Sequence, residues 1–264
     1  VKNVGCAIIG QTANLAPADK VIYGVRDVTA TVESIPLITG SILSKKIAAG
    51  LDGLVMDIKM GNGAFAENLD FAKDLGNSII QVAKQLGMET SALITDMNQP
   101  LGDSIGNALE IKEVIDYLKC EKQESRLNEV VLALAAEMQV AAGLVDSTEI
   151  GHQKAKTVLE SGKAAETFEK MVSELGGPKN LLDHKNLYLK PCPIVKPIPS
   201  PASGFISQID TRTVGLAVVE LGGGRKKASD VIDHSVGLTD VLGLGEKVEA
   251  GQALAYVHAQ NEDQ

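Results

Sequence analysis

The segment from Tyr23 to Lys46, YGVRDVTATVESIPLITGSILSKK, contains the side chains best suited to bind a small polar ligand. Ser41 and Lys45 are four residues apart, so on a helix they lie on one face and can address the same ligand. Arg26 adds a planar fork of donors, and Tyr23 can supply a flanking aromatic surface. Together these groups fit a planar ligand that carries carbonyls and an N–H group.

The same residues also have a simpler interpretation. Lys45 and Lys46 near a helix end are typical of a solvated pair that compensates the helix dipole. Arg26 and Asp27 are adjacent and can form an ion pair at the surface. Spacing alone therefore leaves ligand binding and surface solvation both open.

Composition excludes several classes of protein. The chain has 264 residues, is 44% hydrophobic and carries a net charge of −9, with a pI near 5.0. This length allows one substantial core and a smaller second one. The acidic balance argues against nucleic-acid and membrane partners, which usually need clustered Lys and Arg. No apolar run reaches about 18 residues and the opening lacks a signal peptide, which predicts a cytoplasmic protein.

The hydrophobic pattern alternates strand-like and helix-like segments, as in an α/β core with crossover connections. A helical period also runs from residue 127 to 171, with breaks at Ala142-Gly143 and at Gly162. The other expected elements are strands at Gly5–Gly10, Leu54–Met60 and Ser91–Met97, a loop at Asn14–Lys20, and helices at Val28–Ser34, Ile35–Ala49, Asn68–Leu86 and Asn107–Leu118.

Five of the nine prolines lie between Pro191 and Pro201, which predicts a stiff, extended connector. The following stretch, GLGEKVEAGQALAYVHA, alternates like a hairpin and resembles the hairpin of biotinyl and lipoyl carrier domains. Because Asn261 stands where a carrier would need a modifiable lysine, we expect a structural module there. The predicted fold is α/β, with a helical segment, a mixed central sheet and a small C-terminal α+β barrel-like module.

The predicted domain organisation follows these changes in pattern. The expected parts are the truncated start of the α/β core at 1–15, a helical segment with the ligand motif at 16–50, the α/β core and following helices at 51–190, the connector at 191–201 and the C-terminal module at 202–264.

Two glycine-rich loops, GNGAF and GGGRKK, could hold an anion through backbone N–H groups. Either loop can equally be a plain turn. Cys6, Cys120 and Cys192 are far apart in the sequence and have no C-x-x-C spacing, so we expect neither a disulfide framework nor a thiolate metal site.

Long motifs give a sharper functional hypothesis. The segment YGVRDVTATVESIPLITGSILSKK, with DGLVMDIKMGNGAF, ITDMNQPLG, GNALEIKE and GFISQIDTRTVGLAVVELGGGRKKASDVIDHSVG, resembles the thymidine and pyrimidine nucleoside phosphorylase family over essentially the whole chain. The resemblance implies phosphorolysis of a pyrimidine nucleoside to the free base and a pentose 1-phosphate. It also implies a homodimer, with the nucleoside and phosphate as substrates and no required cofactor.

The resemblance assigns roles to particular residues. Arg26, Ser41 and Lys45 would hold the base, with Tyr23 and Phe65 lining the pocket. Arg26 and Lys45 would be catalytic, because the departing base gains negative charge and fixed donors then stabilise the transition state. Ser41 would orient the ring.

The resemblance also suggests what this chain lacks. The family's phosphate site and catalytic His come from an earlier region, and His152, His184, His234 and His258 match none of its catalytic positions. We therefore expect a central and C-terminal portion without the first third and the extreme C-terminus. The alternative to an enzyme is a non-catalytic fragment that folds, dimerises or binds pyrimidine. Anthranilate phosphoribosyltransferase is disfavoured because that family lacks the Pro-rich C-terminal module.

Some relatives bind a monovalent cation through two backbone carbonyls and a carboxylate. The resemblance carries these ligands over to Leu101, Ser104 and Glu113. A carboxylate with carbonyls is suitable chemistry for a hard cation, although Glu113 is equally suited to be a solvated helix carboxylate.

Overall fold

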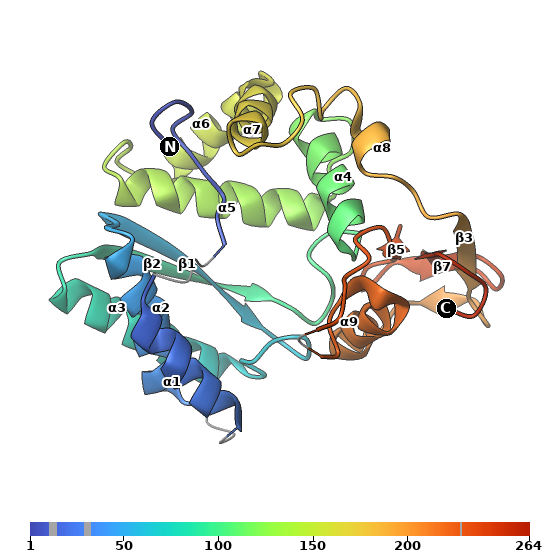
Figure 1. The fold of residues 1–264 in the computed structure, drawn as a ribbon, viewed down its shortest axis with the longest axis horizontal. Coiled ribbons are helices and arrows are strands. Elements are labelled where there is room, and N and C mark those ends of the chain that lie inside the picture. The colour runs from blue at the N-terminus through green and yellow to red at the C-terminus, as the bar shows by residue number, and fades with distance from the viewer. Residues whose placement is uncertain (11–14, 29–32, 228) are drawn as a thin grey trace. The chain divides into compact units, whose positions relative to one another are not determined.

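The computed structural model describes residues 1–10, 15–28, 33–227 and 229–264, and it does not describe the side chains of residues 26–28. The chain divides into two compact units, drawn within one ribbon in Figure 1. One unit contains Val1–Ala7, Met97–Glu129 and Lys156–Gln264, and the other contains Ile8–Asp96 and Val130–Ala155.

Helices dominate the first two thirds of the chain, and short strands dominate the remainder. The helices are α1 (Pro17–Val28), α2 (Ile35–Ala48), α3 (Leu69–Gln85), α4 (Asn107–Leu118), α5 (Ser125–Ala141), α6 (Thr148–Glu160), α7 (Lys163–Glu174), α8 (Lys185–Tyr188) and α9 (Thr211–Val218), which continues into a π-helical turn, Val219–Gly223. The strands are β1 (Gly53–Met60), β2 (Glu89–Asp96), β3 (Ile194–Pro199), β4 (Gly204–Phe205), β5 (Gly237–Thr239), β6 (Lys247–Val248) and β7 (Ala253–Ala259).

The unit of residues 8–96 and 130–155 is organised by a strand–helix–strand crossover. Strands β1 and β2 are parallel, in register from Gly53 opposite Glu89 to Met60 opposite Asp96. Helix α3 connects them, and the Asn68 side chain caps it by accepting the Phe71 N–H at 2.9 Å. The predicted strands and helix are thus confirmed in type, with boundaries shifted by one or two residues.

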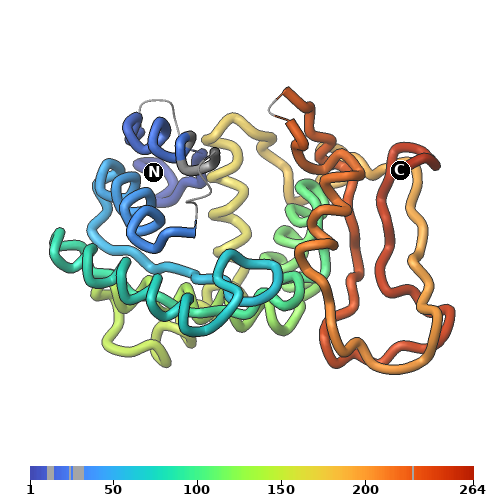
Figure 2. Tube along the Cα trace, turned by 90° about the horizontal axis from the view of Figure 1, so that it is seen from below, coloured from blue at the N-terminus to red at the C-terminus, as the bar shows by residue number. Residues whose placement is uncertain are grey.

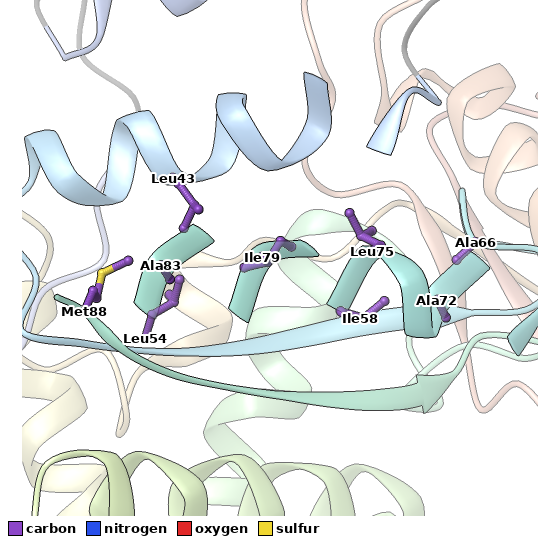
Figure 3. Packing of buried hydrophobic residues seen from close by; sticks show 9 residues of the cluster. All are labelled: Leu43, Leu54, Ile58, Ala66, Ala72, Leu75, Ile79, Ala83 and Met88. Carbon is purple, nitrogen blue, oxygen red and sulfur yellow. The ribbon is translucent and has the colours of Figure 1, made fainter. Parts of the chain in front are cut away.

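One side of β1 and two helices form the core of this unit. Leu54 and Ile58 alternate inward from β1, and Figure 3 shows them beneath Ile79 of α3, with Leu43 reaching down from α2. Leu43 is 2% exposed and Ile79 is fully buried. Helix α2 is therefore fixed on α3 by apolar burial, which in turn fixes the directions of its other faces.

Two expectations near the start of the chain are wrong. The strand expected at Gly5–Gly10 is not formed, because none of the described strands pairs with these residues and a strand needs a hydrogen-bonded partner. The loop expected at Asn14–Lys20 is helical from Pro17 onward, where α1 starts, and proline is well suited to the first turn of a helix. Asn14 lies outside the described residues. The helix expected at Val28–Ser34 falls partly outside the described residues.

The helical stretch beyond residue 125 breaks where the sequence predicts. Gly143 follows α5 with a left-handed φ of 64°, and the Leu144 N–H bonds the Gln139 carbonyl at 2.9 Å. This is a glycine C-cap, which satisfies carbonyls at the helix end. Gly162, with φ 78°, separates α6 from α7 in the same sense. No helix in the described ranges is long and apolar enough to cross a membrane.

The C-terminal sheet differs from the predicted hairpin. Strand β7 pairs on one edge with β3 and on the other with β5, all antiparallel, while β6 pairs with β4. Strands β6 and β7 therefore do not form a hairpin with each other. Orange and red tube in Figure 2 traces these strands, and within the described residues they do not close into a barrel.

The proline-rich segment predicted as a connector is part of the C-terminal sheet. The proline-rich segment contains β3, an edge strand, where Pro197 and Pro199 are tolerated because an edge strand leaves one row of N–H groups unpaired. The mixed central sheet is not found in the described part of the chain, where β1 and β2 form a two-stranded parallel sheet.

Replacing Ile79 should test the core of the crossover. Ile79→Ala should lower the free energy of unfolding by about 2–5 kcal/mol, because it removes buried methyl groups and leaves a cavity. Urea unfolding measures this loss. Ile150→Ala on α6, where Ile150 is 47% exposed, is the matched control and should change stability by about 0.5 kcal/mol or less. Equal losses in the two variants would contradict this assignment of the core.

His258 should make stability depend on pH. Its Nε2 lies 2.9 Å from Thr239 Oγ1, and burial lowers the pKa of His258, as does nearby Lys112, while Asp240 opposes the shift. The folded state then binds the proton less readily than the unfolded chain. The free energy of unfolding should therefore fall as pH drops below about 6.5.

Unfolding by urea at a series of pH values measures this dependence. His258→Gln should flatten it, whereas replacing the exposed His152 by Gln should leave it unchanged. A His258→Gln variant with the original pH profile would show that another group is responsible.

Candidate functional site

Helix α2 carries Ser41 and Lys45, two of the residues predicted to bind the ligand. Its position is set by Leu43 in the core and by a hydrogen bond of 2.9 Å between Thr39 Oγ1 and Ser78 Oγ on α3. Ser41 and Lys45 lie one helical turn apart, and Lys45 Nζ donates to Ser41 Oγ at 2.8 Å. The predicted shared face is present.

The partner that sequence reasoning missed is Asp19. Its Oδ2 lies 2.7 Å from Lys45 Nζ. Asp19 and Ser41 are each 8% exposed, and the Lys45 side chain is 25% exposed. The sequence pattern predicts a loop around residue 19 and so does not predict this contact. Pro17 at the first position of α1 and Asp19 in its first turn are the signal of a helix start that could have revealed it.

Helix α1 carries the other two residues of the motif. Tyr23 follows Asp19 by one turn of α1, and its side chain is 45% exposed. The backbone of Arg26 lies in the last turn of α1, and its side chain is outside the described part of the structure. The contact between Lys45 and Asp19 therefore joins the helix of Tyr23 and Arg26 to that of Ser41.

Phe65 lies in the loop that follows β1. The Gly61 N–H bonds the Ala66 carbonyl at 2.9 Å, and the Ala64 N–H bonds the Gly61 carbonyl at 3.0 Å, which closes the loop on itself. The Phe65 side chain is 70% exposed, so it does not line an enclosed pocket in this structure.

The glycine-rich loops use several of their donors internally. In GNGAF, the Gly61 and Ala64 N–H groups bind carbonyls of the loop, as above. In GGGRKK, the Asp230 carboxylate accepts the N–H groups of Lys226 at 3.0 Å and Lys227 at 2.8 Å. These contacts favour plain turns over anion sites at both places.

The three residues of the cation hypothesis lie close together in the other unit. Glu113 projects from α4 toward the loop of Leu101 and Ser104, and its Oε1 accepts the Asp103 N–H at 2.9 Å. Gly102 permits this approach, since a Cβ there would lie 2.3 Å from Glu113 Oε1. Burial raises the pKa of Glu113 to about 7, against the opposing effect of the Asp103 N–H.

The Glu113 carboxylate alone would not hold a hard cation, so the site would also need the backbone carbonyls of Leu101 and Ser104. In the described part of the chain, no group of three or more His, Cys, Asp or Glu side chains could hold a metal ion. One half-buried carboxylate beside backbone carbonyls suits a weakly bound monovalent ion better than a tightly held divalent one.

Comparison with known families places these residues in context. Residues 1–165 match the glycosyl transferase family, a/b domain, and residues 205–264 match the pyrimidine nucleoside phosphorylase C-terminal domain. The chain belongs to this glycosyl transferase family. The resemblance to thymidine and pyrimidine nucleoside phosphorylases, drawn from the motifs, is confirmed.

Curated relatives match this chain along essentially its whole length. It is 52% identical over 264 residues to a thymidine phosphorylase of Sinorhizobium fredii, covering 100% of this chain and 60% of the relative. It is 53% identical over 264 residues to one of Burkholderia cenocepacia, covering 99% and 60%. It is 53% identical over 261 residues to one of Rhizobium meliloti, covering 99% and 59%. The chain thus spans about 60% of the length of these relatives.

If Glu113 helps to bind a monovalent cation, salt identity should affect stability. At pH 8 and equal ionic strength, KCl should raise the thermal unfolding midpoint above that in choline chloride, because a cation that binds only the folded state stabilises it. Glu113→Gln keeps an oxygen for the Asp103 N–H but removes the charge, and should abolish the difference. Glu129→Gln, in the same unit, is the control. Identical midpoints in the two salts would refute the cation site.

Proposed function

We propose that this chain takes part in the phosphorolysis of thymidine and related pyrimidine deoxynucleosides, giving thymine and 2-deoxy-D-ribose 1-phosphate, and that it supplies the pocket for the base. The names of its relatives support this reaction. The observation that carries the assignment of the pocket is the Lys45 ammonium held 2.8 Å from the Ser41 hydroxyl. Both residues stand at positions that the motif assigns to the base.

The reaction explains why such donors are useful. The bond between C1′ and N1 breaks and its electron pair stays on the base, while a phosphate oxygen forms a bond to C1′. The sugar gains positive charge and the base gains negative charge. Donors fixed at the base carbonyls therefore bind the transition state more strongly than the substrate.

In this proposal, Arg26 and Lys45 stabilise the departing base, and Ser41 orients the ring. Because Lys45 donates to Ser41 Oγ, the Ser41 hydroxyl keeps its own hydrogen to donate to the base. Tyr23 and Phe65, both substantially exposed, cover the faces of the ring when it binds.

We also propose that the chain acts as a homodimer, with phosphate as co-substrate and no required cofactor. Exposed apolar side chains on α1 support an interface between copies: Val21 is 70% exposed, Ile22 53% and Val25 55%. This surface lies in the same unit as the base-binding residues.

An assay of base release tests the function. The purified chain is incubated with thymidine, deoxyuridine or uridine, with and without phosphate, and free base is measured. Arg26→Ala should lower phosphate-dependent turnover about 10²–10³-fold, because it removes a donor to the departing base. Arg212→Ala, at an exposed arginine of α9, is the control and should retain activity.

Binding of thymine, measured by calorimetry on the same proteins, separates the two candidate functions. Saturable binding without turnover, weakened by Arg26→Ala, would favour a base-binding module over an enzyme. Turnover and binding both unaffected by Arg26→Ala would show that the base pocket is elsewhere.

A further inference from the structure

The ion pair between Asp19 and Lys45 is unusual for its low exposure. Asp19 is 8% exposed, and its Oδ2 lies 2.7 Å from Lys45 Nζ. Exposed ion pairs typically contribute about 0–1 kcal/mol and tolerate many geometries. A carboxylate removed from water has fewer alternatives and holds its cation in a narrower range of positions.

Lys45 is therefore held from two directions. An ammonium has three N–H donors, and the described contacts direct two of them, to Asp19 Oδ2 at 2.7 Å and to Ser41 Oγ at 2.8 Å. The two acceptors come from different helices, α1 and α2, so the position of the nitrogen depends on both. Among the contacts of the described residues, one donor direction of Lys45 remains for a ligand.

We propose that Asp19 is a positioning residue for Lys45. It holds the flexible side chain over Ser41, so that the remaining N–H of the ammonium points toward a carbonyl of the pyrimidine. Without Asp19, the lysine would lose orientation and the base would have to restrict its motion on binding, at an entropic cost. This inference rests on the proposed base pocket, because Lys45 must contact the base for its orientation to matter.

Asp19 has a second effect that the experiment must separate. It lies in the first turn of α1, where a negative charge stabilises the helix dipole. A loss of that stabilisation would affect every function of α1, whether or not Lys45 is present. The proposal instead predicts that the effect of Asp19 on thymine binding depends on Lys45.

A double-mutant cycle distinguishes the two effects. Thymine binding to the full chain is measured by calorimetry for the unaltered protein, Asp19→Asn, Lys45→Met and the double variant. Asp19→Asn alone should weaken binding about tenfold, and should weaken it no further when Lys45 is already Met. Asp19→Glu should restore part of the affinity, because it keeps the charge. Asp70→Asn, at an exposed acid in the first turn of α3, is the control and should bind normally.

Equal weakening by Asp19→Asn in both backgrounds would overturn the proposal and indicate a role in helix stability alone. Normal binding by Asp19→Asn together with lost binding by Lys45→Met would also overturn it, while leaving the base pocket intact. Normal binding by Lys45→Met would instead contradict the proposed function.

A second measurement tests the positioning without thymine. Lysine amines are acetylated by a limiting amount of acetic anhydride, and each site is quantified by peptide mass spectrometry. Asp19→Asn should increase the labelling of Lys45 severalfold relative to its neighbour Lys46, because the amine is no longer held against a carboxylate. Unchanged relative labelling would show that Asp19 does not restrain Lys45, even if the unaltered chain fails to bind thymine and the proposed function falls.

Discussion

The burial of α3 between the parallel strands and α2 is the constraint on which the candidate base site depends. Ile79 is fully buried at its centre, Leu54 and Ile58 approach from β1, and Leu43 approaches from α2. Because Leu43 must face this core, Ser41 and Lys45 are directed to other parts of the α2 surface. Burial of an apolar face thus fixes the direction of side chains that have no part in the core.

In the unit that contains residues 97–129 and 156–264, the segment before α4 approaches the backbone of β5 closely. Ile105, just before α4, exchanges two hydrogen bonds with Leu238 of β5, at 2.9 and 2.8 Å. A Cβ at Gly237 would lie 2.0 Å from the Ile105 carbonyl oxygen, so only glycine allows this bridge, and its φ of 150° also suits glycine. The bridge connects the start of the helix that carries Glu113 to the C-terminal sheet.

The candidate base site combines polar groups that are held by packed helices with aromatic side chains that are exposed. Asp19, Ser41 and Lys45 form a small, mostly buried polar cluster on two helices, whereas Tyr23 and Phe65 are exposed. Such an arrangement suits a site in which fixed donors meet the polar edge of a ligand and exposed aromatics cover its faces. The glycine-rich loops, by contrast, satisfy several of their own donors.

The sequence by itself determined the local elements and the family. The core strands, helices α2, α3 and α4, and the breaks at Gly143 and Gly162 follow from hydrophobic period and glycine, which act over a few residues. The spacing of Ser41 and Lys45 likewise predicted a shared face.

Only the tertiary structure decided which segments pair. Strand β7 has the alternation of a hairpin strand, but β3 and β5 occupy its two edges and β6 pairs with β4. Asp19 meets Lys45 across 26 positions of the sequence, a contact no local pattern specifies. Several distant segments could pair with the same strand edge or pack on the same helix face. Which of them does so depends on the packing of the whole chain, and a local sequence pattern does not contain that information.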